Sequence, residues 1–294
     1  MSDAVPTLRL VPPPEDAGIG VPGQIPETVG DPPLPIEPLS EPYLGPEAIA
    51  PTMPVAALAF VSLRRHTRAF LRHEAGARLG ENPEALHDMR VAGRRMRAAI
   101  GLFAPYLPKR AEALRRELGR LGRILGVVRD LDVQLDQLTA WRRDAPPPEG
   151  PSFDAIEAVL ARKRQIARRS LLRTLDGARY DRFKARLCSF LRRGPLRRPA
   201  TSRNPARLAA PELIGRRYNA TRKVGDRLTR ESSPVQFHAL RIRAKRLRYA
   251  LEFHQPLYDG EVAAMIESLT ALQDLLGEHQ DAFVAVGHLE ALAG

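Results

Sequence analysis

The sequence predicts an all-α protein built as a duplicated bundle of long antiparallel helices. Three observations predict this fold. Apolar residues recur at helical spacing from Pro54 onward, alternating strand-like runs are absent, and the stretch that begins at His87 recurs at His238. A repeat of about 150 residues is too long for a solenoid and matches a duplicated three- to four-helix bundle. We therefore expect a helical domain over residues 54–294, with halves at 54–193 and 206–294 that pack about a pseudo-two-fold axis.

Residues 1–53 are predicted to be a leader outside this domain. They contain thirteen prolines and eight acidic residues against one base, Arg9. Such a composition is typical of disordered, partly polyproline-II chains. We expect a solubilising segment. The alternatives are a ligand for a partner that binds proline-rich peptides, which the sequence does not name, and an acidic competitor that folds back on the basic domain.

The helices of the first half follow from periodicity and proline positions. We expect one helix over 55–79 and a second over 83–106, with Pro83 in its first turn and Pro105 and Pro108 at its exit. A third helix over 109–143 ends before a proline-rich loop at 145–152. Two further helices, at 153–176 and 180–193, complete this half.

The second half repeats the first three of these helices, after a connector at 194–205 that is rich in proline and arginine. Helices are expected at 210–231, 234–258 and 260–292. The long third helix of each half carries an apolar seam at spacings of four, three and four, which predicts burial in an antiparallel bundle. The seam residues are Leu114, Leu118, Leu121 and Leu125 in the first half, and Met265, Leu269, Leu272 and Leu276 in the second.

Residues 87–133 and 238–284 align without a gap at an offset of 151. The first copy opens HDMRVAGRRMRAAI and the second HALRIRAKRLRYAL. The paired positions include charged residues as well as core residues, so chemistry recurs along with packing. The pairs are His87/His238, Arg90/Arg241, Arg94/Lys245, Arg95/Arg246, Arg97/Arg248, Leu118/Leu269, Leu125/Leu276, Gly126/Gly277 and Asp130/Asp281.

Four nitrogen side chains form a stripe on each repeated helix. Positions 87, 90, 94 and 97 fall within about 80° of one another on a helix. Apolar residues occupy the opposite face: Met89, Met96, Ile100 and Phe103 in one copy, and Leu240, Leu247 and Leu251 in the other. Like charges at these spacings repel, so an anion is expected to offset the repulsion. A solvated basic face is the alternative, and recurrence in two places favours a binding site. The stripes are His87, Arg90, Arg94 and Arg97, and His238, Arg241, Lys245 and Arg248.

Further basic residues precede each stripe. Arg64, Arg65, Arg68 and Arg72 lie on the first helix, and Arg216, Arg217, Arg222 and Lys223 on its counterpart. Arg116, Arg120 and Arg123 form another stripe that extends the site or faces water. Mixed arginine and lysine suits phosphate oxygens, because the arginine fork grips two oxygens at once. Each stripe begins with a histidine, whose charge is expected to follow the occupancy of the site by an anion. The alternative is a neutral histidine that donates to a carbonyl or to a carboxylate such as Asp88 or Asp281.

Composition limits the function classes. The net charge is +12, and the residues after 54 hold 45 bases against 26 acids, which favours a nucleic acid, an acidic membrane surface or a phosphate polymer as ligand. The single cysteine, Cys188, excludes an intramolecular disulfide and a multi-thiolate metal site. The absence of a secretion signal or of a long apolar run predicts a cytoplasmic protein that does not span a membrane.

Catalytic signatures are absent. The sequence has no phosphate-binding glycine loop, no G-x-S-x-G elbow and no H-E-x-x-H spacing. The carboxylates of the third helices are expected to orient arginines through salt bridges. They are Asp130, Asp132, Asp136, Asp274, Glu278 and Asp281. We expect neither a metal nor another cofactor.

The segments HDMRVAGRRMRAAI, LGRLGRILGVVRDLDV, HALRIRAKRLRYALEF and LTALQDLLGEHQDAF resemble the conserved histidine α-helical domain, the CHAD family. The resemblance covers about residues 55–292. It implies a pseudosymmetric helical bundle with a basic central channel that binds inorganic polyphosphate, and an association with polyphosphate granules. It also implies that the eight stripe residues line that channel, flanked less surely by Arg64, Arg65, Arg216, Arg217 and Lys223. The E-x-E-x-K domain that adjoins many relatives is missing here.

The function expected from the sequence is therefore non-enzymatic binding of polyphosphate in a groove lined by arginine, lysine and histidine. The first alternative is a nucleic-acid-binding protein, which the low aromatic content disfavours for single strands. The second is a metal-dependent phosphohydrolase.

Overall fold

The computed structural model describes residues 42–50, 52–144, 150–195, 204–258, 260 and 262–293, and their regular structure is helical. The one β pairing in these ranges is an isolated antiparallel bridge between Pro54 and Pro205. The helices are α1 (Val55–Arg72), α2 (Glu74–Leu79), α3 (Pro83–Leu102), η1 (Ala104–Tyr106), α4 (Ala111–Asp144), α5 (Gly150–Leu175), α6 (Ala178–Arg193), α7 (Ala206–Gly225), α8 (Pro234–His254), η4 (Gln255–Leu257) and α9 (Ala263–Ala293). The all-α prediction is confirmed.

The helix predicted over 55–79 is interrupted at His73, which ends α1 and precedes α2. Helix α2 then ends at Gly80, which has a φ of 72° and so occupies the left-handed region that glycine adopts without strain. The carbonyl groups of this end are bonded from outside, because the Arg168 guanidinium of α5 donates to the carbonyls of Ala77, Arg78 and Leu79.

Helix α7 begins at Ala206, earlier than the predicted start at 210, and contains Pro211 in its second turn. Proline has no N–H, so it cannot donate to the carbonyl of Arg207 four residues earlier. The hydroxyl of Tyr258 donates to that carbonyl instead, at 3.2 Å. This contact explains how the helix continues through a residue that usually limits it.

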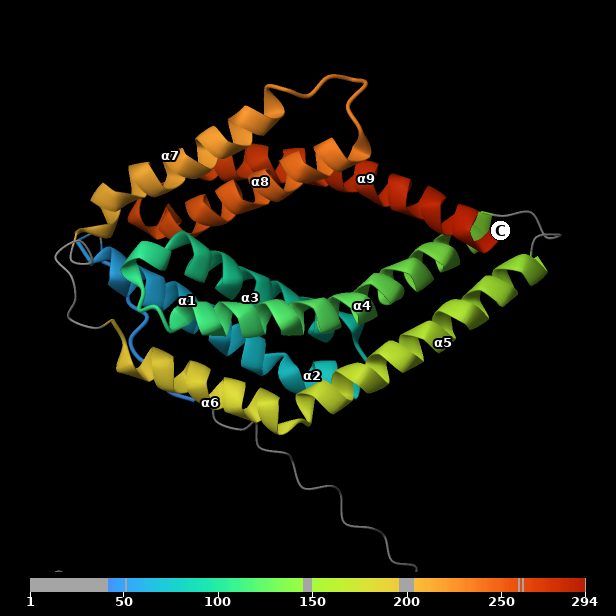
Figure 1. The fold of residues 1–294 in the computed structure, drawn as a ribbon, viewed down its shortest axis with the longest axis horizontal. Helices are drawn as coiled ribbons and strands as arrows, with labels where there is room; N and C mark the ends of the chain where they lie inside the picture. The colour runs from blue at the N-terminus through green and yellow to red at the C-terminus, as the bar shows by residue number, and fades with distance from the viewer. Residues whose placement is uncertain are drawn as a thin grey trace, which may run out of the picture. The chain divides into compact units, whose positions relative to one another are not determined.

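The described helices pack in two groups. In the first group α1 packs on α3, α3 on α4 and α4 on α5, and α6 contacts α1, α4 and α5. In the second group α7 packs on α8 and α8 on α9. The groups meet where α3 contacts α8 and α1 contacts α7, and Figure 1 shows α7, α8 and α9 together above α3 and α4. The two helices that carry the basic stripes are thus neighbours.

The core confirms most of the apolar pattern. Met89, Met96, Ile100 and Phe103 are buried, as are all four leucines of the first seam and Leu269 and Leu276 of the second. The expectation for Met265 is wrong, because its side chain is 45% exposed. It lies in the first turn of α9, which packs mainly on α8, whereas α4 is covered by α3, α5 and α6.

Residues 42–50 pack on the helical domain, although the predicted boundary placed them in the leader. Leu44 is fully buried, and Arg64 of α1 donates to the carbonyls of Leu44, Pro46 and Leu191 at 2.8 Å each. A buried arginine that loses its water needs such partners, and backbone carbonyls supply them here. Most of the leader and most of the 194–205 connector lie outside the described residues.

The bridge between Pro54 and Pro205 joins the chain just before α1 to the chain just before α7. The N–H of Val55 donates to the carbonyl of Asn204 at 3.0 Å, and the N–H of Ala206 donates to that of Met53 at 2.8 Å. The starts of the two helices therefore lie side by side. In the described part of the chain, no helix is both long and apolar enough to span a membrane.

Candidate anion-binding groove

The first basic stripe lies on α3 and the second on α8, and each helix begins with a defined cap. Asn82 accepts the N–H of Glu84 at 2.9 Å before α3, where Pro83 occupies the first position. Before α8 the Gln236 side chain accepts the N–H of Ser233 at 2.7 Å, and Pro234 occupies the first position. Both starts match local sequence signals for helix initiation. The caps fix the phase in which the stripes are presented.

The two stripes come together around Lys245. Burial, together with the charges of Arg241, Arg94, Arg248 and Arg90, lowers the pKa of Lys245 from 10.5 to about 8. Two of these arginines belong to α8 and two to α3. Cations from both repeated helices therefore share one region, which we call the central groove.

Small residues on the following helices leave room for the arginines of the stripes. A Cβ added at Gly126 of α4 would lie 3.5 Å from Nε of Arg90, and a Cβ added at Gly277 of α9 would lie 3.3 Å from Nη2 of Arg241. Both pairs occupy equivalent positions of the repeat. The guanidinium groups thus lie across α4 and α9, a close approach that a larger side chain would obstruct.

The last position of each stripe follows a related pattern. Arg97 lies over Gly119, where an added Cβ would be 3.5 Å from its Nε. Its counterpart Arg248 donates from Nη1 to the hydroxyl of Thr270 at 3.3 Å. Glycine and threonine occupy equivalent positions, so a small residue accompanies the arginine in both copies.

Several nitrogen atoms of the stripes are buried without a hydrogen-bond partner among the described residues. They are Nδ1 of His87 and His238 and Nε of Arg94 and Arg241, and the hydroxyl of Tyr249 shares this property. Buried polar atoms of folded proteins are nearly always bonded to protein, water or a ligand. Donors left open on both stripes indicate a site that receives an acceptor from outside.

Acidic groups near the stripes are few. Glu252 accepts ion pairs from Arg95 at 3.2 Å and Arg248 at 3.5 Å. Burial lowers the pKa of Arg90, and Asp130 is close enough for its charge to raise it partly back. These carboxylates orient individual arginines, and the groove remains cationic.

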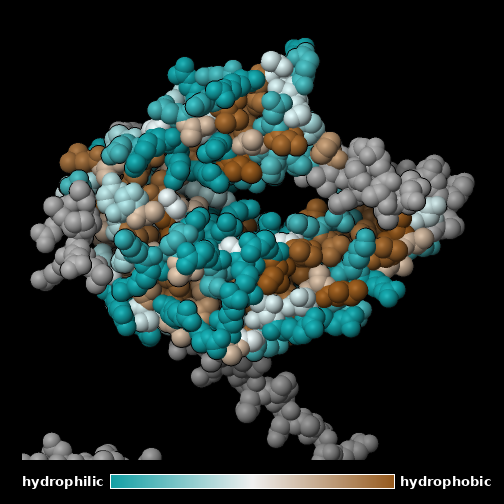
Figure 2. All heavy atoms as spheres, in the orientation of Figure 1, coloured by the Kyte–Doolittle hydropathy of each residue, from teal (hydrophilic) through white to brown (hydrophobic). Residues whose placement is uncertain are grey.

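A cavity of about 540 Å³ opens where α3, α4, α7 and α8 meet. Its charged lining is entirely basic: Arg94, Arg97, Arg115, Arg217, Lys245 and Arg246. Arginines also surround Tyr249, since the guanidinium carbons of Arg94, Arg95 and Arg248 lie 6.0, 5.9 and 5.7 Å from its ring centroid, within cation–π range. Figure 2 shows a separate opening between the two groups of helices.

The histidines of the stripes are half-buried. Burial lowers the pKa of His87, with a further contribution from the charge of Arg129. Asp88 pairs with His73, with its Oδ2 3.7 Å from Nε2, and its charge also raises the pKa of His87 partly back. The side chain of Asp281, the other expected partner, lies outside the described residues.

The flanking residues expected from the sequence divide into two sets. Arg217 lines the cavity and donates to the carbonyl of Gly101 at 3.2 Å. Arg64 does not belong to the groove, because it is buried and holds backbone carbonyls elsewhere. Arg65 donates to the carbonyl of Glu47, and Arg216 pairs with Glu212 at 3.5 Å. Lys223 is exposed near the end of α7 and does not line the cavity.

Arg246, Tyr249 and Arg115 line the cavity although they were not among the predicted site residues. Arg246 had a signal, because it pairs with Arg95 in the repeat, and Tyr249 directly follows Arg248 of the second stripe. Arg115 had none that distinguishes it from other arginines of α4, and Glu112 fixes its position with bonds of 2.7 and 2.8 Å. The salt bridge expected for Asp132 forms with Arg164 of α5. Among the described residues, no group of three or more histidine, cysteine or carboxylate side chains is placed to hold a metal ion.

Comparison with known proteins gives a consistent result. The model of the CHAD domain family matches residues 61–290. Two proteins of Mycobacterium tuberculosis, both named as uncharacterized, are 29% identical over 214 residues, which is 70% of this chain. The chain spans 40% of the length of these relatives.

Solved structures share the fold. The crystal structure of the CHAD domain from the plant Ricinus communis superposes with a TM-score of 0.69 at 27% identity, covering 84% of this chain and 81% of that one. PptA from Streptomyces chartreusis superposes with a TM-score of 0.58 at 19% identity, covering 74% and 81%. The second likeness is one of fold alone.

Proposed function

This chain belongs to the CHAD domain family, and from that premise we propose that it binds inorganic polyphosphate in the central groove. The family is linked to polyphosphate-related proteins. The observation that carries the proposal is the meeting of both stripes around Lys245, with buried nitrogen donors left open on each. A chain of phosphates supplies acceptor oxygens along its whole length, and arginine forks grip them bidentately.

The dimensions and charge of the groove suit a flexible polymer. From His87 to Arg97 the α3 stripe spans about 15 Å, enough for several successive phosphates. Each phosphate that the protein neutralises releases bound counterions, so affinity falls steeply as salt rises. Because the chain is proposed to bind polyphosphate, we also propose that it associates with polyphosphate granules in the cytoplasm.

Nucleic acid is the alternative ligand for such a groove. Tyr249 is the aromatic side chain of the cavity nearest the stripes, and it is buried among arginines, so it offers no open platform for stacking bases. We therefore expect polyphosphate to bind more tightly than duplex DNA at equal phosphate concentration.

We propose that the two halves are related by a local two-fold axis. Its support is the bridge, in which Val55 bonds Asn204 while Ala206 bonds Met53. At the offset of 151 residues Met53 corresponds to Asn204 and Val55 to Ala206, so the two bonds are equivalent. Such reciprocal contact between equivalent surfaces is the signature of two-fold association. An axis at this point relates α3 to α8 and so relates the two stripes.

We also propose that binding occurs without turnover. The charged groups that line the cavity are guanidinium and ammonium groups, which bind phosphate oxygens. Incubation of the protein with polyphosphate and magnesium or manganese tests this. Sustained release of orthophosphate above the protein-free rate would favour the phosphohydrolase alternative.

Calorimetric titration of the full chain with long-chain polyphosphate and with duplex DNA tests the ligand. The variant Arg90→Glu/Lys245→Glu places two negative charges in the groove, and we expect it to lose at least about tenfold in polyphosphate affinity. The matched control is Arg162→Glu/Lys163→Glu, which makes the same charge change at exposed positions of α5. Equal affinities of the two variants, with helicity retained in both, would contradict the groove assignment.

A further inference from the structure

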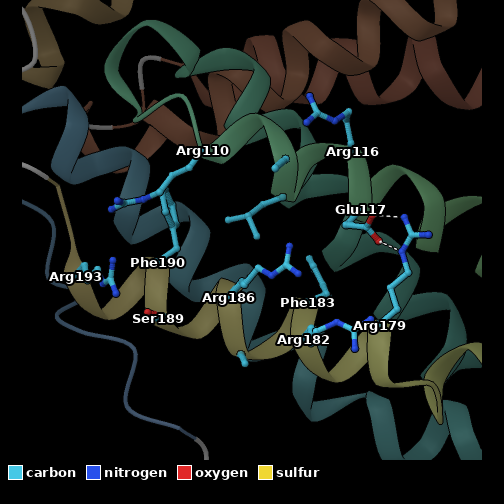
Figure 3. Close-up of a pocket in the computed structure, with 13 residues that line it drawn as sticks. Arg110, Arg116, Glu117, Arg179, Arg182, Phe183, Arg186, Ser189, Phe190 and Arg193 are labelled. Carbon is cyan, nitrogen blue, oxygen red and sulfur yellow. Dashed lines mark hydrogen bonds and ion pairs between the residues drawn. The ribbon is translucent and has the colours of Figure 1, made fainter.

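A second cationic surface lies between α4 and α6, apart from the residues of the central groove. Four arginines recur on α6 at spacings of three, four and seven, which places them on one face of the helix. Two more arginines line the same cavity, one directly before the first residue of α4 and one in the second turn of that helix (Figure 3). The six are Arg179, Arg182, Arg186, Arg193, Arg110 and Arg116. We call the cavity that they line, of about 970 Å³, the α4–α6 pocket.

The charge of this pocket is nearly unopposed. Its one acidic lining residue is Glu117, whose carboxylate accepts bonds from Arg179 and from Arg120. Arg110 lies over the ring of Phe190, with its guanidinium carbon 5.4 Å from the centroid. The remaining four arginines of the set have no ion-pair partner among the described residues. A stripe of like charges weakens the helix that carries it, so an anion that binds there stabilises α6.

The six arginines of the lining are suited to phosphate oxygens. Phe183 and Phe190 line the pocket but are only 3% and 4% exposed, so a ligand meets little of their faces. The pocket presents guanidinium groups beside the apolar atoms of its lining, and Figure 3 shows Arg186 extending from α6 into the space beside α4. Such groups bind phosphate in a planar, bidentate manner.

The pocket and the central groove share α4 as a wall. Arg115 lines the cavity of the groove, and Arg116, the next residue, lines the α4–α6 pocket. A helix with its side chains is about 10 to 12 Å across, so the two sites are separated by roughly one helix diameter. A flexible polyanion longer than the groove can round α4 at this point and enter both sites.

We propose that the α4–α6 pocket is a second binding site for the same polyphosphate chain that occupies the central groove. This inference rests on the proposed function for the identity of its ligand. Linking two sites through one ligand makes the second contact intramolecular, which raises the overall affinity by a factor of about a hundred to ten thousand when the geometry allows both. Short chains gain nothing from the pocket, because they end inside the groove.

The test is the affinity of the full-length protein for tripolyphosphate and for long-chain polyphosphate in four forms. The forms are the unmodified chain, the pocket variant Arg182→Ser/Arg186→Ser, the groove variant Arg90→Ser/Lys245→Ser, and the control Arg162→Ser/Lys163→Ser. The pocket and control variants each lose two charges from exposed side chains of a helix surface. Circular dichroism verifies that each variant keeps its helices.

We expect the pocket variant to lose at least about tenfold in affinity for the long chain and to bind tripolyphosphate as the unmodified protein does. A long-chain affinity equal to that of the control would overturn the second site. Weakened tripolyphosphate binding in the pocket variant would also overturn it, because the pocket would then be a primary site. The groove variant reports separately on the proposed function, which fails if that variant binds both ligands normally.

Discussion

If polyphosphate binds in the central groove as proposed, the pKa of Lys245 should make its affinity depend on pH in a range where most side chains do not titrate. Burial and four nearby arginines lower this pKa from 10.5 to about 8. A bound polyanion favours the charged form and raises the pKa again toward its ordinary value. Binding therefore takes up a proton at pH values between about 8 and 10.5. The contribution of Lys245 to affinity is constant below about pH 8 and falls as the pH rises through 8, because deprotonation of the unbound protein competes with binding.

The size of the effect follows from the two pKa values. At pH 9 about nine-tenths of the unbound protein carries neutral Lys245, while a bound form with a pKa near 10.5 keeps its proton. The affinity at pH 9 should thus be about tenfold lower than at pH 7. Calorimetry at pH 9 in buffers of different ionisation enthalpy should report uptake of about one proton for each groove that is filled.

The control is Lys245→Arg, since arginine stays charged throughout this range. Its affinity should vary little between pH 7 and pH 9, and its proton uptake at pH 9 should fall to near zero. The comparison at matched pH cancels any titration of the ligand itself. If the affinity of Lys245→Arg changes with pH as that of the native chain does, the assignment of the proton to Lys245 is refuted. If the affinity of the native chain does not change between pH 7 and pH 9, the coupling of binding to protonation is refuted.

Three further predictions concern packing. Gly126→Leu should displace the Arg90 guanidinium and weaken polyphosphate binding about tenfold, while Gly122→Leu, where an added Cβ meets no atom within 4 Å, should not; equal titrations of the two would contradict the role of the small residue. Arg64→Met should lower the free energy of unfolding in urea by about 3 kcal/mol through lost carbonyl bonds, with the affinity of the folded protein unchanged. Tyr180→Phe should cost about 1 to 2 kcal/mol in the same assay, because its buried hydroxyl donates to a carboxylate at 2.7 Å; no change would mean that water replaces that bond.

Periodicity and capping signals predicted the helices well, because those signals act over short distances. Pro83 and Pro234 both begin helices as expected, and the buried seam of α4 follows its spacing. The departures have tertiary causes. Helix α7 continues through Pro211 because Tyr258, far along the chain, bonds the carbonyl that proline leaves open.

The candidate site was predictable to the extent that it repeats. The recurrence at an offset of 151 identified both stripes, and the structure brings the two helices together. Sequence alone did not separate arginines that face the groove from those that hold the fold. Arg64 and Arg217 occupy similar places in the sequence pattern, yet one clamps backbone carbonyls and the other lines the cavity. That difference depends on the course of residues 42–50, which periodicity does not predict.

The bridge at Pro54 and Pro205 has a consequence for motion between the halves. The first amides of a helix have no partner within it and ordinarily exchange their hydrogens with solvent quickly. Here Val55 and Ala206, both fully buried, are bonded across the junction. Their exchange therefore requires the halves to part, so these two amides act as reporters of hinge opening. If the groove admits its polymer without such opening, they remain as protected as the deepest core during binding, and the chain threads into a preformed site.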